Sequence, residues 1–122
     1  MRLLIVDDSK TMRTMLSSYA QALNCEVAVA EDGVAALEKL EESTDYDAIL
    51  IDWDMPRMNG LELLKVIKAN PALDGAKTMM VTAQSSMDRV SEALTLGADD
   101  YLMKPFDEPM VADKLRLLGI VA

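Results

Sequence analysis

Carboxylate, hydroxyl and amino side chains follow four of the apolar runs in this sequence. Asp7 and Asp8 come directly after the first run, and Asp52 follows the third. Thr82 follows the fourth run, and Lys104 follows the fifth. If the runs form a parallel sheet, these side chains meet at one of its edges, because such sheets bind ligands at the carboxyl ends of their strands.

Carboxylates gathered at one edge repel each other, and one of them becomes protonated unless a cation lies between them. Mg²⁺ suits such a site because it accepts one or two carboxylates and keeps positions for waters and phosphate oxygens. A carboxylate can also act as a nucleophile and form an aspartyl phosphate. A lysine and a threonine hydroxyl would then stabilise the charge on the transferred group. The residue types therefore predict Mg²⁺-dependent phosphoryl transfer to an aspartate, a reaction that needs no histidine on this chain.

Each residue taken alone also has a structural explanation. Asp7 and Asp8 could begin the first helix, where acidic side chains interact favourably with the helix dipole. Asp52 could form a turn, which is the commonest role of an aspartate after a strand. Thr82 and Lys104 are weak signals by themselves. The joint occurrence of these residues at the ends of four strands is what favours a site.

Five apolar runs predict the strands that position these residues. Nearly continuous apolar runs are typical of strands buried on both faces, as in a parallel sheet. The runs are Leu3–Val6, Cys25–Ala30, Ala48–Ile51, Thr78–Val81 and Tyr101–Met103. The second run contains Glu26 and is the least apolar, which indicates an edge strand.

Helical periodicity separates the runs. Apolar residues in each interval recur at spacings of three and four, which predicts helices with one buried face. These residues are Met12, Met15, Leu16, Tyr19 and Leu23; Val34, Leu37 and Leu40; Leu61, Leu64 and Ile67; Val90, Ala93 and Leu94; and Val111, Leu115 and Leu118. Ser9 or Asp8 is placed to cap the first helix. The repeated alternation of strand and helix predicts an α/β fold with right-handed crossovers, in one domain over residues 1–122.

The amino-acid composition excludes several classes of function. The 12 Lys and Arg against 21 Asp and Glu give a net charge of −9, which disfavours binding to nucleic acids. The absence of His excludes serine-type triads and most catalytic zinc sites. The single Cys fits a reducing cytosol. No run approaches the ~18 apolar residues of a membrane helix, so we expect a cytoplasmic protein without a signal sequence or membrane insertion.

Four segments resemble the receiver domain of bacterial response regulators, most closely the stand-alone chemotaxis (CheY-like) kind. They are LLIVDDS at 3–9, DAILIDWDMPRMNG at 47–60, MMVTA at 79–83 and DDYLMKPF at 99–106. The resemblance that rests on these segments, in this order and spacing, covers essentially the whole chain. The resemblance implies a flavodoxin-like, doubly wound fold with no output domain. Its parallel sheet would have five strands in the order 2-1-3-4-5, flanked by five helices.

The resemblance also implies the ligands of the metal. Asp52 would be the phosphoacceptor and, with Asp8, would bind Mg²⁺ directly. Asp7 would act through a water molecule, and the backbone carbonyl of Asp54 would complete the protein ligands. This chemistry modifies the protein itself, so the resemblance implies a switch and not an enzyme that acts on other substrates.

Other residues match the phosphoryl-binding and switch positions of the receiver family. Lys104 would pair with the phosphoryl group, and the Thr82 hydroxyl would move onto it. The backbone N–H groups of Trp53 and Ala83 would be further donors. Tyr101 matches a switch aromatic that turns inward when Thr82 moves.

The partners that the resemblance implies are proteins. The phosphodonor would be the phosphohistidine of a sensor histidine kinase in a two-component system. The fourth helix, fifth strand and fifth helix would form the output surface for a downstream target, such as the flagellar motor or a phosphatase in chemotaxis. Asp54 and Gln84 occupy positions that vary in the family and influence the lifetime of the phosphoryl group, and the sequence does not give the sign of their effect.

Three other functions fit parts of the pattern. The segment Asp52-Trp53-Asp54 resembles the nucleophile motif of haloacid dehalogenase phosphatases, which form an aspartyl phosphate, but that motif belongs to a first strand. A flavodoxin shares the sheet order, yet Asp7 and Asp8 would repel the phosphate of its flavin. A protein-interaction module without phosphorylation would have no need of the acidic cluster.

Overall fold

The structure is a computed structural model that describes residues 1–83 and 87–122. Parallel strands form one sheet in the order β2-β1-β3-β4-β5. The strands are β1 (Arg2–Val6), β2 (Glu26–Ala30), β3 (Ala48–Asp52), β4 (Lys77–Ala83) and β5 (Asp100–Lys104). The predicted fold class and strand order are confirmed, and the least apolar strand, β2, lies at an edge as predicted.

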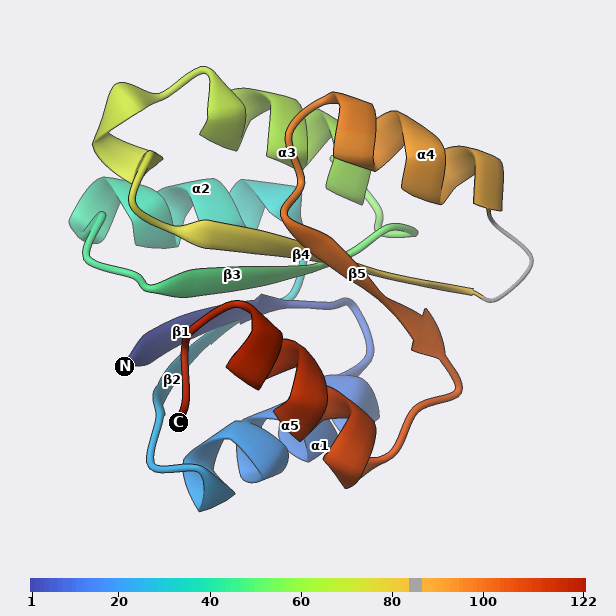
Figure 1. Ribbon diagram of the computed structural model, residues 1–122. Helices are drawn as coiled ribbons and strands as arrows, with labels where there is room; N and C mark the ends of the chain where they lie inside the picture. Colours follow the sequence, from blue (N-terminus) through green and yellow to red (C-terminus); the bar gives the residue numbers. More distant parts are fainter. Residues whose placement is uncertain (84–86) are drawn as a thin grey trace.

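Helices cover both faces of the sheet (Figure 1). One face carries α2 (Gly33–Glu42), α3 (Gly60–Lys68) and α4 (Met87–Thr95), and the other carries α1 (Lys10–Ala22) and α5 (Glu108–Leu117). A short 3-10 helix, η1 (Pro71–Leu73), follows α3. Within the described ranges, none of the helices combines the length and apolar character needed to cross a membrane.

The strands contribute alternate residues to two cores. In β1, Leu4 and Val6 belong to the core on the side of α2, α3 and α4. Leu3 and Ile5 belong to the core on the side of α1 and α5. Burial on both faces explains why the sequences of β1 and β3 are nearly continuously apolar and show no alternation with polar residues.

Three strands continue beyond their apolar runs and take in predicted site residues. β3 ends at Asp52, β4 includes Thr82 and Ala83, and β5 ends at Lys104. The register pairs Asp52 with Val81 and Ala83 with Lys104, so these residues belong to the hydrogen-bonded ladder. Asp52, Thr82, Ala83 and Lys104 therefore sit on the ends of strands, whereas Asp7 and Asp8 follow β1.

Local polar contacts fix the ends of α1. The Ser9 hydroxyl caps the helix by accepting from the Met12 N–H at 3.2 Å. Asp8, the other residue predicted as a possible N-cap of α1, does not cap the helix. The predicted start of the second strand at Cys25 is wrong by one residue, because the Cys25 N–H donates to the Ala20 carbonyl at 3.1 Å and closes the end of α1.

Gly60, the first residue of α3, lies against the strand that carries Asp52. A Cβ atom on Gly60 would overlap the Asp52 carbonyl oxygen and come within 2.9 Å of the Trp53 Cα. Because these are backbone atoms, we expect Gly60→Ala to lower the free energy of unfolding in urea by about 2–3 kcal/mol. Gly75→Ala is the control, since nothing lies within 4 Å of its added Cβ. Equal losses in the two variants would contradict this reading of the contact.

Candidate functional site

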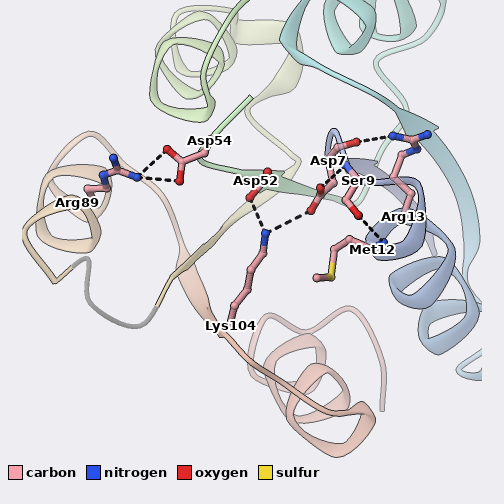
Figure 2. A network of polar contacts seen from close by, with 8 residues as sticks. All are labelled: Asp7, Ser9, Met12, Arg13, Asp52, Asp54, Arg89 and Lys104. Atoms are coloured by element: carbon pink, nitrogen blue, oxygen red, sulfur yellow. Dashed lines mark hydrogen bonds and ion pairs between the residues drawn. The ribbon is translucent and has the colours of Figure 1, made fainter. Parts of the chain in front are cut away.

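The predicted acidic residues meet at the carboxyl edge of the sheet, as Figure 2 shows for Asp7 and Asp52. Asp7 directly follows β1, and Asp52 ends β3. One carboxylate oxygen from each of Asp7, Asp8 and Asp52 lies within 4.8 Å of the others. Asp7 and Asp52 are buried, whereas Asp8 is exposed. The structure thus brings together the three carboxylates that the sequence predicts to converge.

Lys104 supplies positive charge to this acidic cluster. Its Nζ atom donates to Asp52 Oδ1 at 3.0 Å and lies 3.8 Å from Asp7 Oδ2. The lysine side chain is 30% exposed, so it reaches from the surface to two buried carboxylates. One ammonium cannot neutralise three carboxylates, which leaves the cluster short of positive charge.

Two buried oxygens lack a hydrogen-bond partner within residues 1–83 and 87–122. They are Asp7 Oδ2 and Thr82 Oγ1. The other carboxylate oxygen of Asp7, Oδ1, accepts from the Ser9 N–H at 2.9 Å, and Arg13 donates to the Asp7 carbonyl at 2.8 Å. Buried polar atoms are costly when they have no partner. Their presence here fits a site that binds a divalent cation and phosphate oxygens.

Burial alters the protonation of the acidic cluster. It raises the pKa of Asp52 to about 6, against the lowering effect of the hydrogen bond from Lys104. Burial also raises the pKa of Asp7, and the hydrogen bond from the Ser9 N–H only partly offsets this. For Lys104, burial lowers the pKa, but the hydrogen bond and charge of Asp52 outweigh burial and raise it. A divalent cation among these groups would favour the ionised carboxylates.

We expect the stability of the protein to fall between about pH 5 and pH 7.5 in buffer without divalent cations. The folded-state pKa of Asp52, about 6, lies above the unfolded value of about 4, so the folded protein binds this proton more tightly. The resulting stabilisation is full below about pH 4 and is lost as the pH rises through about 6. With allowance for solvent screening, the loss is about 1 kcal/mol.

Urea denaturation at the two pH values measures this loss. The chain has no His, so no side chain with an ordinary pKa titrates in this range. Asp52→Asn should flatten the pH dependence, and saturating Mg²⁺ should do the same in the parent protein. An Asp52→Asn variant with the parent's slope would show that another group is responsible.

The side chain of Asp54 lies apart from the acidic cluster. Its exposed carboxylate accepts from Arg89 Nη1 at 2.9 and 3.1 Å (Figure 2). The Arg89 guanidinium also lies 5.4 Å from the centre of the Trp53 ring, so α4 contacts the loop after β3. Arg89 was not predicted, because no pattern in the sequence marks a contact between an arginine and a carboxylate 35 residues away. The backbone carbonyl of Asp54 stays a predicted metal ligand.

The two backbone N–H groups predicted to donate to the phosphoryl group, those of Trp53 and Ala83, lie in different surroundings. The Trp53 N–H donates to the Val81 carbonyl at 3.1 Å, and its role as a donor to the phosphoryl group stays a prediction. Ala83 ends β4 and is exposed, and its N–H stays a predicted donor. Gln84 lies outside the described residues.

Thr82 and Tyr101 lie on the neighbouring strands β4 and β5. Thr82 is buried, and Tyr101 is half-buried and packs against the core on the α2, α3 and α4 side. The Nζ atom of Lys114 lies 4.6 Å from the centre of the Tyr101 ring and donates to Asp100 at 2.8 Å. The Tyr101 side chain therefore contacts the core and is also partly exposed to solvent. Its inward movement stays a prediction.

The placement of these residues along the chain matches one protein family. Residues 3–116 match the response regulator receiver domain. The chain belongs to this family. The resemblance seen in the sequence is therefore confirmed, and it covers nearly the whole chain. Receiver domains are signalling switches of two-component systems that interact with histidine kinases and downstream targets, so membership supports a phosphorylation-dependent switch.

Relatives of this receiver domain include chemotaxis proteins. Chemotaxis protein CheY1 of Helicobacter pylori strain J99 is 38% identical over 119 residues, which cover 97% of this chain and 96% of the relative. The CheY homolog of Campylobacter jejuni strain 81-176 is 38% identical over 117 residues, covering 95% and 90%. The structure of Vibrio cholerae CheY4 has a TM-score of 0.89 at 32% identity, with 96% of this chain and 97% of that chain covered. Sequence and structure comparisons thus both support the chemotaxis branch of the family.

Proposed function

We propose that this receiver domain, residues 1–122 as one unit, accepts a phosphoryl group on Asp52 in a Mg²⁺-dependent reaction and then changes its protein partner. The observation that supports this most strongly is the buried Asp52 carboxylate, 3.0 Å from Lys104 and grouped with the Asp7 and Asp8 oxygens. A carboxylate placed at the carboxyl edge of a sheet among cation-binding groups is suited to attack an electrophile.

The donor atoms of the acidic cluster fit Mg²⁺. Carboxylate oxygens and a backbone carbonyl are the ligands that hard cations prefer, whereas nitrogen and sulfur ligands favour other metals. Asp8 and Asp52 would hold the ion directly, Asp7 through water and Asp54 through its carbonyl. The buried Asp7 Oδ2, which has no hydrogen-bond partner among the residues that the structure describes, supports this assignment. When bound, Mg²⁺ would neutralise negative charge on the transferred group.

The side chains at the sheet edge carry out the transfer. An Asp52 carboxylate oxygen attacks phosphorus, an O–P bond forms, and the P–N bond of the donor phosphohistidine breaks. The donor imidazole keeps the electron pair of that bond and takes up a proton. Lys104 stabilises the charge on the phosphoryl oxygens. The buried Thr82 hydroxyl, which has no partner within the described ranges, donates to another of these oxygens.

The new phosphoryl group changes the charge of the site and the position of Thr82. It adds a charge of about −1.5 to −2 and three strong acceptor oxygens. Movement of Thr82 toward these oxygens opens space on β4, and Tyr101 turns into that space from β5. The surface formed by α4, β5 and α5 then favours a different partner, to the extent that the two states bind the phosphoryl group differently.

The proposed partners are a sensor histidine kinase and a downstream protein. Relatives named as chemotaxis proteins support a role in chemotaxis or motility, with the flagellar motor or a phosphatase as the target. Exposed apolar side chains on α4 and α5 fit a protein partner, and they are Met87, Leu94, Met110 and Leu117. The net charge of −9 opposes nucleic-acid binding. We place this signalling in the cytoplasm.

Acetyl phosphate tests the proposed function directly. With Mg²⁺ present, the protein should gain the mass of one phosphoryl group, and the fluorescence of Trp53, its only Trp, should change. Chelation of the metal should prevent both changes. An unchanged mass under these conditions would contradict the proposal. Continuous hydrolysis of an added phosphate ester would instead support a phosphatase of the haloacid dehalogenase type.

A further inference from the structure

The loop that joins β3 to α3 contains a strained turn at Arg57. The Met58 N–H donates to the Pro56 carbonyl at 2.7 Å and closes a three-residue turn centred on Arg57. Arg57 has a φ of 65°, in the left-handed region that residues other than glycine rarely adopt. A γ-turn with a positive central φ is rare and strained. Such strain persists only where surrounding contacts enforce it, and it concentrates at functional sites.

An ion pair with a buried carboxylate holds Arg57 in this conformation. The Nε and Nη2 atoms of Arg57 donate to the two carboxylate oxygens of Asp32, at 2.7 and 2.9 Å. The Asp32 side chain is 6% exposed and that of Arg57 is 53% exposed, so the arginine reaches inward from the surface. Asp32 also caps α2 by accepting from the Ala35 N–H at 2.8 Å. A two-donor fork fixes orientation as well as distance, so Arg57 ties the loop to the start of α2.

Close packing joins the same segments. A Cβ atom on Gly33, the first residue of α2, would lie 2.7 Å from the Met58 Cβ. At the far end of the loop, the Gly60 N–H donates to the Trp53 carbonyl at 2.8 Å. The loop is therefore fixed at its ends and in its middle, and Asp54 lies between these points.

We propose that Arg57 is a positioning residue for the metal site: its ion pair with Asp32 holds the loop in the shape in which the Asp54 carbonyl serves as a ligand. This inference rests on the proposed function, because it assumes that the Asp7–Asp8–Asp52 cluster binds Mg²⁺. Arg57 acts through the loop, so its replacement removes no ligand. Contacts that orient ligands in this way typically change metal affinity by about 10- to 100-fold.

The Arg57→Gly variant distinguishes a positioning role of Arg57 from an effect on the stability of the protein and from an effect of its charge. Glycine adopts a positive φ without strain, so the variant loses the ion pair and the strain together, and its midpoint of unfolding in urea should stay near that of the parent. Loss of a cation would by charge alone strengthen Mg²⁺ binding. We expect binding of MgCl₂, followed by Trp53 fluorescence and by calorimetry, to be about tenfold weaker.

Two further variants complete the comparison. Asp32→Asn keeps an oxygen that can cap α2 but loses the charge that orients Arg57, and Mg²⁺ binding should weaken by a similar factor. The double variant should bind within about twofold of Arg57→Gly, because both changes remove the same contact. Arg116→Ala is the matched control, since it removes an exposed arginine from an ion pair with Asp113 on α5 and should leave binding unchanged.

The outcomes distinguish this inference from the proposed function. Weaker Mg²⁺ binding by Arg57→Gly at an unchanged midpoint supports the inference. Equal or tighter binding, in a parent protein that binds Mg²⁺, overturns it and leaves the proposed function intact. A parent protein that binds no Mg²⁺ overturns the proposed function. If Arg57→Gly loses stability, Arg57→Asn repeats the test, because asparagine also tolerates a positive φ and is too short to form the same fork.

Discussion

The Asp52→Asn protein should take up no phosphoryl group from acetyl phosphate in the presence of Mg²⁺. Asn has nearly the size of Asp, but its amide lacks the charged oxygen that attacks phosphorus. Removal of a nucleophile typically slows a reaction by more than about 10³-fold, so we expect no modified protein on a timescale that modifies the parent completely. Intact mass measured over time gives both rates.

Two control measurements show whether the loss of phosphorylation in Asp52→Asn is due to the loss of the nucleophile. Asp54→Asn removes an exposed carboxylate two residues away, paired with Arg89, and should still be modified. Asp52→Asn should be at least as stable as the parent at about pH 7.5 without Mg²⁺, because it avoids the cost of ionising a buried carboxyl group. Modification of Asp52→Asn at the parent's rate, or peptide mapping of the parent's phosphate to Asp7 or Asp8, would contradict the assignment of Asp52.

The fold could be predicted largely because its central strands are buried on both faces. Every residue of β3 is buried, so Ala48–Ile51 stands out as an apolar run. The ends of the strands were less predictable. Asp52 ended the run in the sequence because it is charged, yet pairing with Val81 keeps it in the strand. Hydropathy marks burial, whereas hydrogen bonding between strands decides where a strand ends.

The site was predictable where it depends on the ends of parallel strands. Asp7 and Asp52 converge with Lys104 because the strand order places β1, β3, β4 and β5 side by side. Contacts between loops and helices were not predictable. Arg57 and Asp32 are 25 residues apart on two loops, and only the folded chain brings them to hydrogen-bond distance. No periodic pattern in the sequence indicates such a contact.

Lys104→Met should slow phosphorylation of Asp52 by about 100-fold while Mg²⁺ binding becomes no weaker. The ammonium lies 3.0 Å from Asp52 Oδ1, where it can stabilise charge on the transferred group, and loss of one such group typically costs about 10²- to 10³-fold in rate. The same ammonium competes with a metal ion for the acidic cluster, so its removal favours Mg²⁺. Opposite effects on rate and on metal affinity distinguish this role from damage to the fold.

The charge balance of the site explains why these two effects differ in sign. The carboxylates of Asp7, Asp8 and Asp52 are balanced when Lys104 and a divalent cation are both present. Without Lys104, a negative phosphodonor approaches a site with excess negative charge, which slows transfer even at saturating Mg²⁺. Lys68→Met is the matched control, because Lys68 is similarly exposed, at 33%, and lies 3.8 Å from the Asp99 carboxylate. Parallel losses of rate and Mg²⁺ affinity in Lys104→Met, or an equal loss of rate in Lys68→Met, would show that Lys104 does not act on the phosphoryl group.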